Sequence, residues 1–211
     1  MKIINKIILP FIFLLPAVLL YGQAGNGDKS LKYFNKTEAG ISFGLGSFKT
    51  DIYNGIQKKV RNDEIIVTLQ TINGFKYMNK VAIGLSVGAE VWQNGLFWPI
   101  YGYLGYDFKP ADNTFFADVY IGSAPGNRDA NSFYHAGKGA FAFSIGLGYK
   151  MKVAKKLKFM YEVFYKYQSI ESTYDYKTEF ERNDSIFSYS RTVDYKIPLH
   201  FAGFKIGICF P

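Results

Sequence analysis

Cysteine and histidine are nearly absent from this chain of 211 residues, which has one cysteine and two histidines. A single thiol, Cys209, cannot form an internal disulfide, so the fold does not depend on an oxidising compartment. Zinc sites need three or four convergent ligands, and the widely separated His135 and His200 do not supply a recognisable spacing. We therefore expect no metal, no cofactor and no catalytic residue.

Long apolar runs are missing except at the N-terminus. Lys2 and Lys6 flank the start of an apolar run over residues 7–20, and small residues follow at 22–24, which is typical of a secretory signal peptide. The run is shorter than the roughly 20 residues of a membrane-spanning helix. We expect a signal peptide at 1–24, a periplasmic N-terminal segment at 25–36 and an outer-membrane barrel domain at 37–211. Removing the signal lowers the formal charge from +8 to +6.

The composition excludes two classes of protein. Hydrophobic residues make up 48% of the chain and aromatic residues 18%, too much for a disordered protein. The mean hydropathy of −0.04 is too low for a bundle of transmembrane helices. Apolar residues must therefore alternate with polar ones.

Apolar residues recur at every second position in segments of about ten residues, which indicates β-strands. The segments are 39–45, 65–69, 81–91, 100–108, 115–121, 141–149, 157–167 and 204–210. The face with the apolar residues carries no charge, whereas the opposite face carries glycine, alanine, serine and the charged residues. Such a sheet needs an apolar medium outside. We predict an all-β protein, an eight-stranded antiparallel up-and-down transmembrane β-barrel that follows the signal peptide.

The connections between strands are asymmetric, as in outer-membrane barrels. With the N-terminus in the periplasm, the far connections are 50–63, 93–95, 123–138 and 171–197, and the near ones are 78–80, 109–113 and 151–156. The last far connection keeps partial alternation. We expect the seventh and eighth strands to form a protruding hairpin with its tip near 182–184.

Aromatic residues gather where the strands leave the apolar band, and we predict that they form interfacial girdles. They are Trp98, Tyr101, Tyr103, Tyr106, Phe108, Tyr165 and Tyr167.

Charges on the inward face are the best candidate site. The lumen of an eight-stranded barrel is just wide enough to be filled by side chains, and buried charges must be paired. We expect a packed network of Glu90, Asp118, Glu162, Lys158, Lys166 and Lys205. A narrow pore or gate is the alternative to this plug.

The mature chain resembles the small outer-membrane β-barrel proteins of Bacteroidetes, with their OmpA/OmpX-like architecture. The resemblance is carried by residues 73–84, 139–150, 154–157 and 165–168. Members of this family tend to end in an aromatic strand that the outer-membrane insertion machinery reads. The last strand, with Phe204, Ile206, Ile208 and Phe210, resembles that signal. The resemblance implies fold and location in the bacterial cell outer membrane, and no specific activity.

Three alternatives stay open for function. The favoured one is a non-enzymatic barrel whose long far loops contact a partner, with lipopolysaccharide or phospholipid around it. A lipid A or phospholipid acyl hydrolase or transferase would instead need His135 or His200 beside a serine and a carboxylate. A soluble, lipocalin-like carrier would turn the apolar series inward. The basic residues form no single stripe, so we expect no nucleic-acid partner.

Overall fold

The computed structural model describes residues 31–53, 56–128, 137–182 and 185–210. The predicted signal peptide at 1–24, the proposed hairpin tip at 183–184 and His135 lie outside them. Within them every regular element is a β-strand, and no helix is long and apolar enough to cross a membrane. The strands are β1 (Leu31–Leu45), β2 (Ser47–Tyr53), β3 (Ile56–Arg61), β4 (Ile65–Tyr77), β5 (Val81–Trp92), β6 (Gly95–Phe97), β7 (Ile100–Asp107), β8 (Thr114–Ser123), β9 (Gly126–Arg128), β10 (Gly137–Ala154), β11 (Leu157–Arg182) and β12 (Ser185–Phe210).

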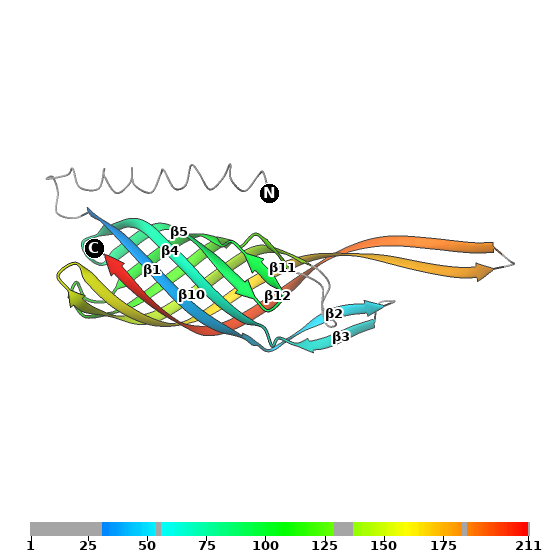
Figure 1. Ribbon diagram of the computed structural model, residues 1–211, viewed down its shortest axis with the longest axis horizontal. Helices are drawn as coiled ribbons and strands as arrows, with labels where there is room; N and C mark the ends of the chain where they lie inside the picture. The colour runs from blue at the N-terminus through cyan, green and yellow to red at the C-terminus, as the bar shows by residue number, and fades with distance from the viewer. Residues whose placement is uncertain (1–30, 54–55, 129–136, 183–184, 211) are drawn as a thin grey trace.

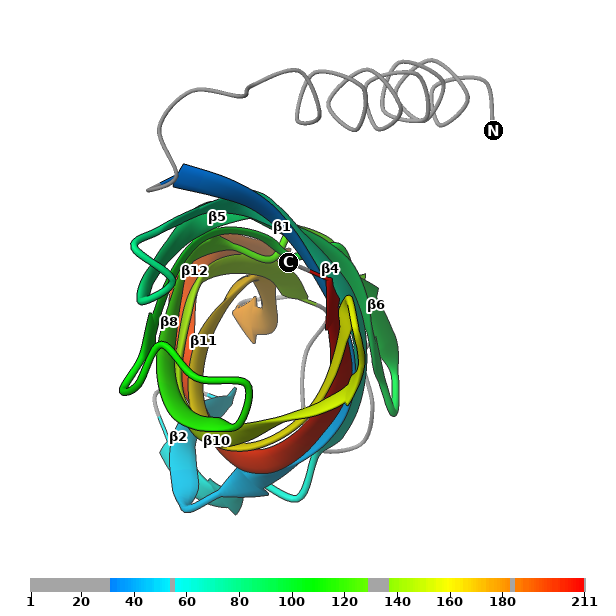
Figure 2. The ribbon, with the colours of Figure 1, turned by 90° about the vertical axis from the view of Figure 1, so that its left-hand side faces the viewer.

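Antiparallel pairing between the long strands closes on itself. Eight long strands pair one after another in the order β1, β4, β5, β7, β8, β10, β11, β12. The ring is completed by β12 against β1, from Leu45↔His200 to Asn35↔Phe210. The view along the axis shows the resulting barrel (Figure 2). Closure removes the free strand edges, whose backbone groups hydrocarbon cannot satisfy.

The two ends of the barrel differ, as the connection lengths predict. The near end carries tight turns, one of which has Met78 and Asn79 at φ 49° and 55°. At the far end β11 and β12 continue as a paired ribbon to Arg182↔Ser185, well past the rest of the barrel (Figure 1). The protruding hairpin is thus confirmed up to its tip. The β2–β3 hairpin leaves the same end, after Gly46 at φ +71°, a conformation that favours glycine.

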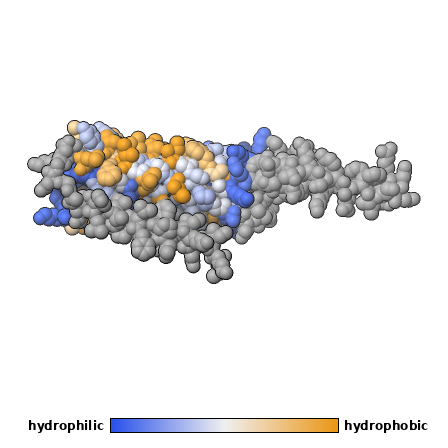
Figure 3. Space-filling model, turned by 90° about the horizontal axis from the view of Figure 1, so that it is seen from above, coloured by the Kyte–Doolittle hydropathy of each residue, from blue (hydrophilic) through white to orange (hydrophobic). Residues whose placement is uncertain are grey.

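The apolar series face outward, as the strand parity predicts. On β5 the side chain of Leu85 is 68% exposed while that of the next residue, Ser86, is fully buried. The same alternation exposes Ile41, Leu104, Phe115, Ile145, Val163 and Phe204 on the other strands. Seen from above, hydrophobic residues form a band between hydrophilic ends (Figure 3). The inward-facing arrangement of a soluble carrier is therefore wrong for this chain.

The interior contains more bulk than the sequence suggested. Small residues line β1, β5 and β10, but Phe116, Tyr120 and Phe164 project inward from β8 and β11. Tyr101 and Tyr103 are also buried, at 4% and 3% exposure, so their assignment to an interfacial girdle is wrong. They alternate with Ile100, Gly102 and Leu104, which places them on the inner face. Small residues on some strands make room for large ones on those opposite.

The barrel begins earlier than expected. β1 starts at Leu31 and pairs with Tyr77 of β4, whereas the sequence placed residues 25–36 in a periplasmic segment. No clean alternation marks this part of the strand, because both faces mix apolar and polar residues: Phe34 and Lys36 face inward, and Leu31 and Asn35 face outward.

Candidate functional site: the charged interior and the near mouth

Five charged residues meet in the middle of the barrel, and we call them the central cluster: Lys36, Glu38, Asp118, Glu162 and Lys205. The Lys36 ammonium lies 2.6 Å from Glu38, 2.8 Å from Asp118 and 3.4 Å from Glu162. The Lys205 ammonium lies 2.9 Å from Glu162 and 3.1 Å from Glu38. All five residues are at most 4% exposed, so each charge depends on its partners.

Polar and aromatic groups complete the central cluster. The Tyr120 hydroxyl donates to Glu38 at 2.9 Å, and Gln70 donates to the same carboxylate. The Lys205 ammonium also lies over the rings of Tyr120 and Phe164, 4.2 and 4.6 Å from their centroids. Such contacts offset part of the cost of taking a cation out of water.

A separate ion pair lies toward the far end. The Lys166 ammonium is 2.5 Å from the Glu90 carboxylate, and both side chains are almost fully buried. The Tyr101 hydroxyl donates a longer hydrogen bond, 3.4 Å, to Glu90. Beyond this pair, Trp92 packs against Phe97 and Phe201, with ring centroids 4.8 and 5.3 Å away.

At the near end Asp107 holds two lysines. Lys150 donates to Asp107 at 2.6 Å, and Lys76 makes a second ion pair with the same carboxylate. The three interior groups together contain five lysines and five carboxylates. The total charge of these groups is therefore zero. The central cluster has one carboxylate more than it has lysines, and the near-end group has one lysine more than it has carboxylates.

The structure corrects the predicted single network in two respects: Glu90 and Lys166 form a pair separate from the central cluster, and Lys158 lies outside the interior. Glu90, Asp118, Glu162, Lys166 and Lys205 are buried inside as expected. Lys158 is not among them: it lies at the near end and donates to the carbonyl of Ala111 at 3.0 Å. Its position beside the turn before β11 puts it at the rim.

Sequence reasoning missed Lys36, the lysine with the most carboxylate partners. It was assigned to the segment before the barrel. The available signal was parity: Lys36 and Glu38 are four and two residues before Gly40, so they continue the face of the first strand that carries small residues.

Side chains fill the lumen at this level. A cavity of only about 10 Å³ remains among Glu90, Tyr101, Tyr120, Lys166 and Lys205, which is about the space of one water molecule. At Gly146 an added Cβ would lie 2.7 Å from an oxygen of Asp118 and closer still to Glu162. Glycine at this position is what lets the two carboxylates approach β10.

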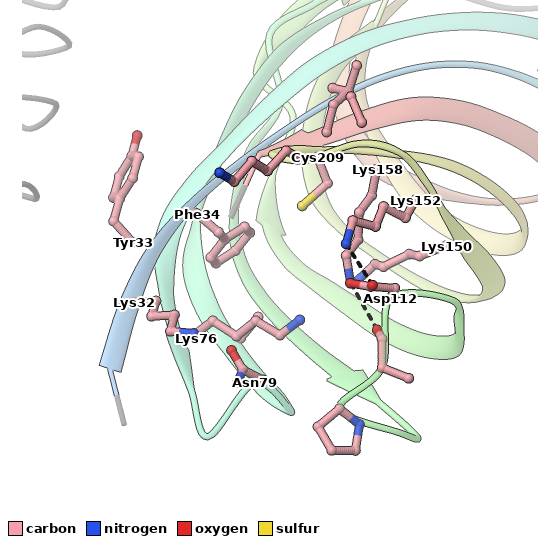
Figure 4. A pocket seen from close by; sticks show the side chains of 16 residues that line it. Lys32, Tyr33, Phe34, Lys76, Asn79, Asp112, Lys150, Lys152, Lys158 and Cys209 are labelled. Atoms are coloured by element: carbon pink, nitrogen blue, oxygen red, sulfur yellow. Dashed lines mark hydrogen bonds and ion pairs between the residues drawn. The ribbon is translucent and has the colours of Figure 1, made fainter. Parts of the chain in front are cut away.

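The near end of the barrel holds a larger space, which we call the near mouth. This pocket has a volume of about 240 Å³ and opens between the ends of β1, β4, β10, β11 and β12 and the turn at 109–113 (Figure 4). Its lysines are Lys32, Lys76, Lys150, Lys152, Lys155 and Lys158. Among its lining residues Asp112 is the one carboxylate, and it is paired with Lys152 at 2.7 Å.

Charges at the exposed ends have ordinary surface pairs. The hydrogen bond from Lys152 lowers the pKa of the exposed Asp112 carboxyl. At the base of the far hairpin, the hydrogen bond to Glu171 raises the pKa of Lys196. Pairs this exposed contribute little to stability.

His200 lies on the outer face near the far end. Its Nδ1 is 2.5 Å from the Tyr165 hydroxyl, and its ring also packs edge-on against Tyr167. Neither a serine nor a carboxylate bonds to the ring in the described part of the chain. His200 thus belongs to an aromatic surface patch that also contains Phe141 and Phe143.

Two further predictions concern metals and membrane insertion. The described residues contain no group of three or more His, Cys, Asp or Glu side chains placed to hold a metal ion. The residues of the proposed insertion signal all project outward from β12; they are Phe204, Ile206, Ile208 and Phe210.

No protein-family model and no curated protein sequence matches the chain. Solved structures with some likeness include Neisserial surface protein A, with 8% identity, a TM-score of 0.48, and coverage of 86% of this chain and 99% of that one. The outer-membrane protein OprG from Pseudomonas aeruginosa has 10% identity, a TM-score of 0.48, and coverage of 84% and 95%. The outer-membrane protein AlkL has 12% identity, a TM-score of 0.38, and coverage of 87% and 93%. Likenesses below a TM-score of 0.5 assign neither family nor function.

Proposed function

We propose that this protein is an integral outer-membrane β-barrel with eight membrane-crossing strands, a plugged lumen and a surface-interaction or structural role. One observation carries the proposal: a closed antiparallel ring has an uncharged apolar band on its outer face and buried ion pairs in its interior. If water surrounded the barrel, exposure of the outer band would cost about 25 cal/mol per Å² of apolar surface. A hydrocarbon surrounding removes the cost, and closure of the ring satisfies the backbone.

The filled lumen supports a plug over a pore. The central cluster, the Glu90–Lys166 pair and the packed rings of Trp92, Phe97 and Phe201 succeed one another along the axis. An eight-stranded barrel has an interior that side chains just fill. Function would then reside outside the barrel wall, on its extensions.

The far hairpin is the part best placed to meet a partner. Loops and extensions on a rigid scaffold commonly carry recognition, and the β11–β12 ribbon reaches well beyond the apolar band (Figure 1). We assign the far end to the cell exterior and the near end to the periplasm, with lipopolysaccharide and phospholipid around the barrel and the last strand read by the insertion machinery.

Heat-modifiable mobility on a gel tests this proposal. Membrane-extracted protein should run as a compact species when unheated and as a slower, unfolded species after boiling, and detergent should be needed to extract it. Protein that remains soluble without detergent after signal removal would refute the membrane assignment.

A further inference from the structure

The near mouth has a surplus of positive charge. Six lysine side chains line it, while Asp112 is the carboxylate in its lining and Asp107, outside the lining, pairs with Lys150. Asp107 is shared between Lys76 and Lys150. Within the described part of the chain, Lys32, Lys155 and Lys158 form no ion pair with a carboxylate.

This surplus differs from the pairing inside the barrel. Deeper in the lumen every lysine has a carboxylate partner within 3.4 Å. At the near mouth lysines from four strands, β1, β4, β10 and β11, and from the turn before β11 converge on one pocket (Figure 4). A concave site lined by one sign of charge concentrates counter-ions, so the pocket favours an anionic ligand.

The types of side chain in the pocket indicate which class of anion it suits. Lysine acts as a compact point charge and binds phosphate well, whereas planar carboxylates are best recognised by the fork of arginine. Arginine is absent from the described lining. The volume of about 240 Å³ is below the range of about 300 to 1,000 Å³ usual for drug-sized ligands, and suits a small charged group.

We propose that the near mouth binds a phosphate group, supplied either as a free phosphate ion or as the headgroup of a phospholipid. This site goes beyond the proposed function, because phosphate binding requires only the folded barrel and not its role in the membrane. Only its assignment to the periplasmic side depends on that function.

Cys209 provides a reporter for this site. It is the sole cysteine of the chain and lines the same pocket, and its side chain is partly accessible. We first compare the labelling rates of a negatively and a positively charged thiol reagent in neutral detergent without phosphate. The ratio of the negative reagent's rate to the positive reagent's rate should be higher at Cys209 than with free cysteine. Inorganic phosphate should then slow labelling of Cys209, while chloride at the same ionic strength should not.

Neutral substitutions identify the residues responsible. Lys158→Gln and Lys32→Gln remove charges that no ion pair uses, and each should weaken phosphate protection about threefold to fivefold. Lys80→Gln is the matched control, because this exposed near-end lysine lies outside the pocket lining. Its protection should equal that of the unchanged protein.

Further arms separate the sources of phosphate. Protection by a short-chain phosphatidylglycerol at lower concentration than inorganic phosphate would identify a lipid headgroup; equal or better protection by phosphate would identify the free ion. Stronger protection by a dicarboxylate such as succinate, or protection unchanged in Lys158→Gln and Lys32→Gln, would overturn the proposal. So would a complete absence of protection. Heat-modifiable mobility of the same samples shows independently whether the barrel itself is folded.

Discussion

Buried lysines and carboxylates determine the interior of this protein at the scale of single residues. Lys36 contacts three carboxylates and Lys205 contacts two, while Lys166 depends on Glu90 alone. A buried charge without its partner retains its desolvation cost. Removing one partner of a pair should therefore destabilise the fold more than removing both partners.

The Glu90–Lys166 pair gives a direct test of this point. Lys166→Met should destabilise the folded barrel by about 3 to 5 kcal/mol, because it leaves the Glu90 carboxylate buried and uncompensated. The double variant Glu90→Gln/Lys166→Met should recover most of the loss. Urea unfolding in lipid vesicles, followed by tryptophan fluorescence, measures both. Equal losses in the single and double variants would contradict the pairing.

Gly146 gives a second test at this scale. Gly146→Ala places a methyl group against Asp118 and Glu162 and should cost about 1 to 3 kcal/mol of unfolding free energy. Gly102→Ala is the matched control, because an added Cβ there has Ile121 O at 3.7 Å as its nearest neighbour. The same urea titration should show Gly102→Ala to be close to the unchanged protein. A similar effect at both glycines would argue against close packing around the carboxylates.

Parity explains what the sequence could and could not predict about residues. Continuous alternation in β5 and β10 placed Leu85 and Ser144 on their correct faces. On β7 the aromatic side chains of Tyr101 and Tyr103 resembled girdle residues by type, although their parity is inward. Lys158 shares the inward parity of Lys166, but it lies at the rim, and distance along the axis is not encoded in alternation.

Each long strand acts as an element of the closed ring, and some strands extend beyond it. The β11–β12 ribbon continues past Glu171↔Lys196 with its own antiparallel pairing. β2 and β3 form a separate two-stranded sheet after the left-handed Gly46. The β11–β12 extension could be predicted, because residual alternation continued through residues 171–197, whereas residues 50–63 were expected only to form a long connection. The partners of these extensions could not be predicted, because exposed pairing carries no information on a ligand.

Shortening the far hairpin tests the independence of the ring. Replacing residues 172–195 with an Asn-Gly turn, which suits a two-residue hairpin, should leave heat-modifiable mobility and urea stability nearly unchanged. The ring pairings all lie outside the deleted segment. Loss of the folded form in this variant would mean that the hairpin is needed to close or assemble the barrel.

At the scale of the whole molecule, polarity is reversed relative to a water-soluble protein. Apolar side chains form the outer band, and the ion pairs and polar groups lie within. The composition implied that apolar and polar residues alternate, since nearly half of the residues are hydrophobic and yet the mean hydropathy is near zero, and the small, charged opposite face of the strands then placed the apolar face outside. What composition could not give is the distribution of charge along the axis, with paired charges in the middle and excess lysine at the near mouth.

A plugged lumen predicts that the protein does not conduct ions steadily. At the level of Glu90 and Lys166, the cavity of about 10 Å³ holds about one water molecule, too little for a continuous water column at that point. Purified barrels in a planar bilayer should show no long-lived conductance level above the bare membrane. A steady open level that persists in several preparations would favour the narrow pore.

The most direct test of the account is the depth and polarity of side chains along one strand. In a Cys209→Ser background, single cysteines at residues 81–83, 85–87, 89 and 91 would carry a spin label in protein reconstituted into lipid vesicles. Odd-numbered positions should show high accessibility to oxygen, which dissolves in hydrocarbon, and the even-numbered positions 82 and 86 should show low accessibility, with the period of two that a strand imposes. High accessibility to a water-soluble nickel complex at the odd positions, or loss of the alternation, would contradict a barrel with its apolar face in lipid.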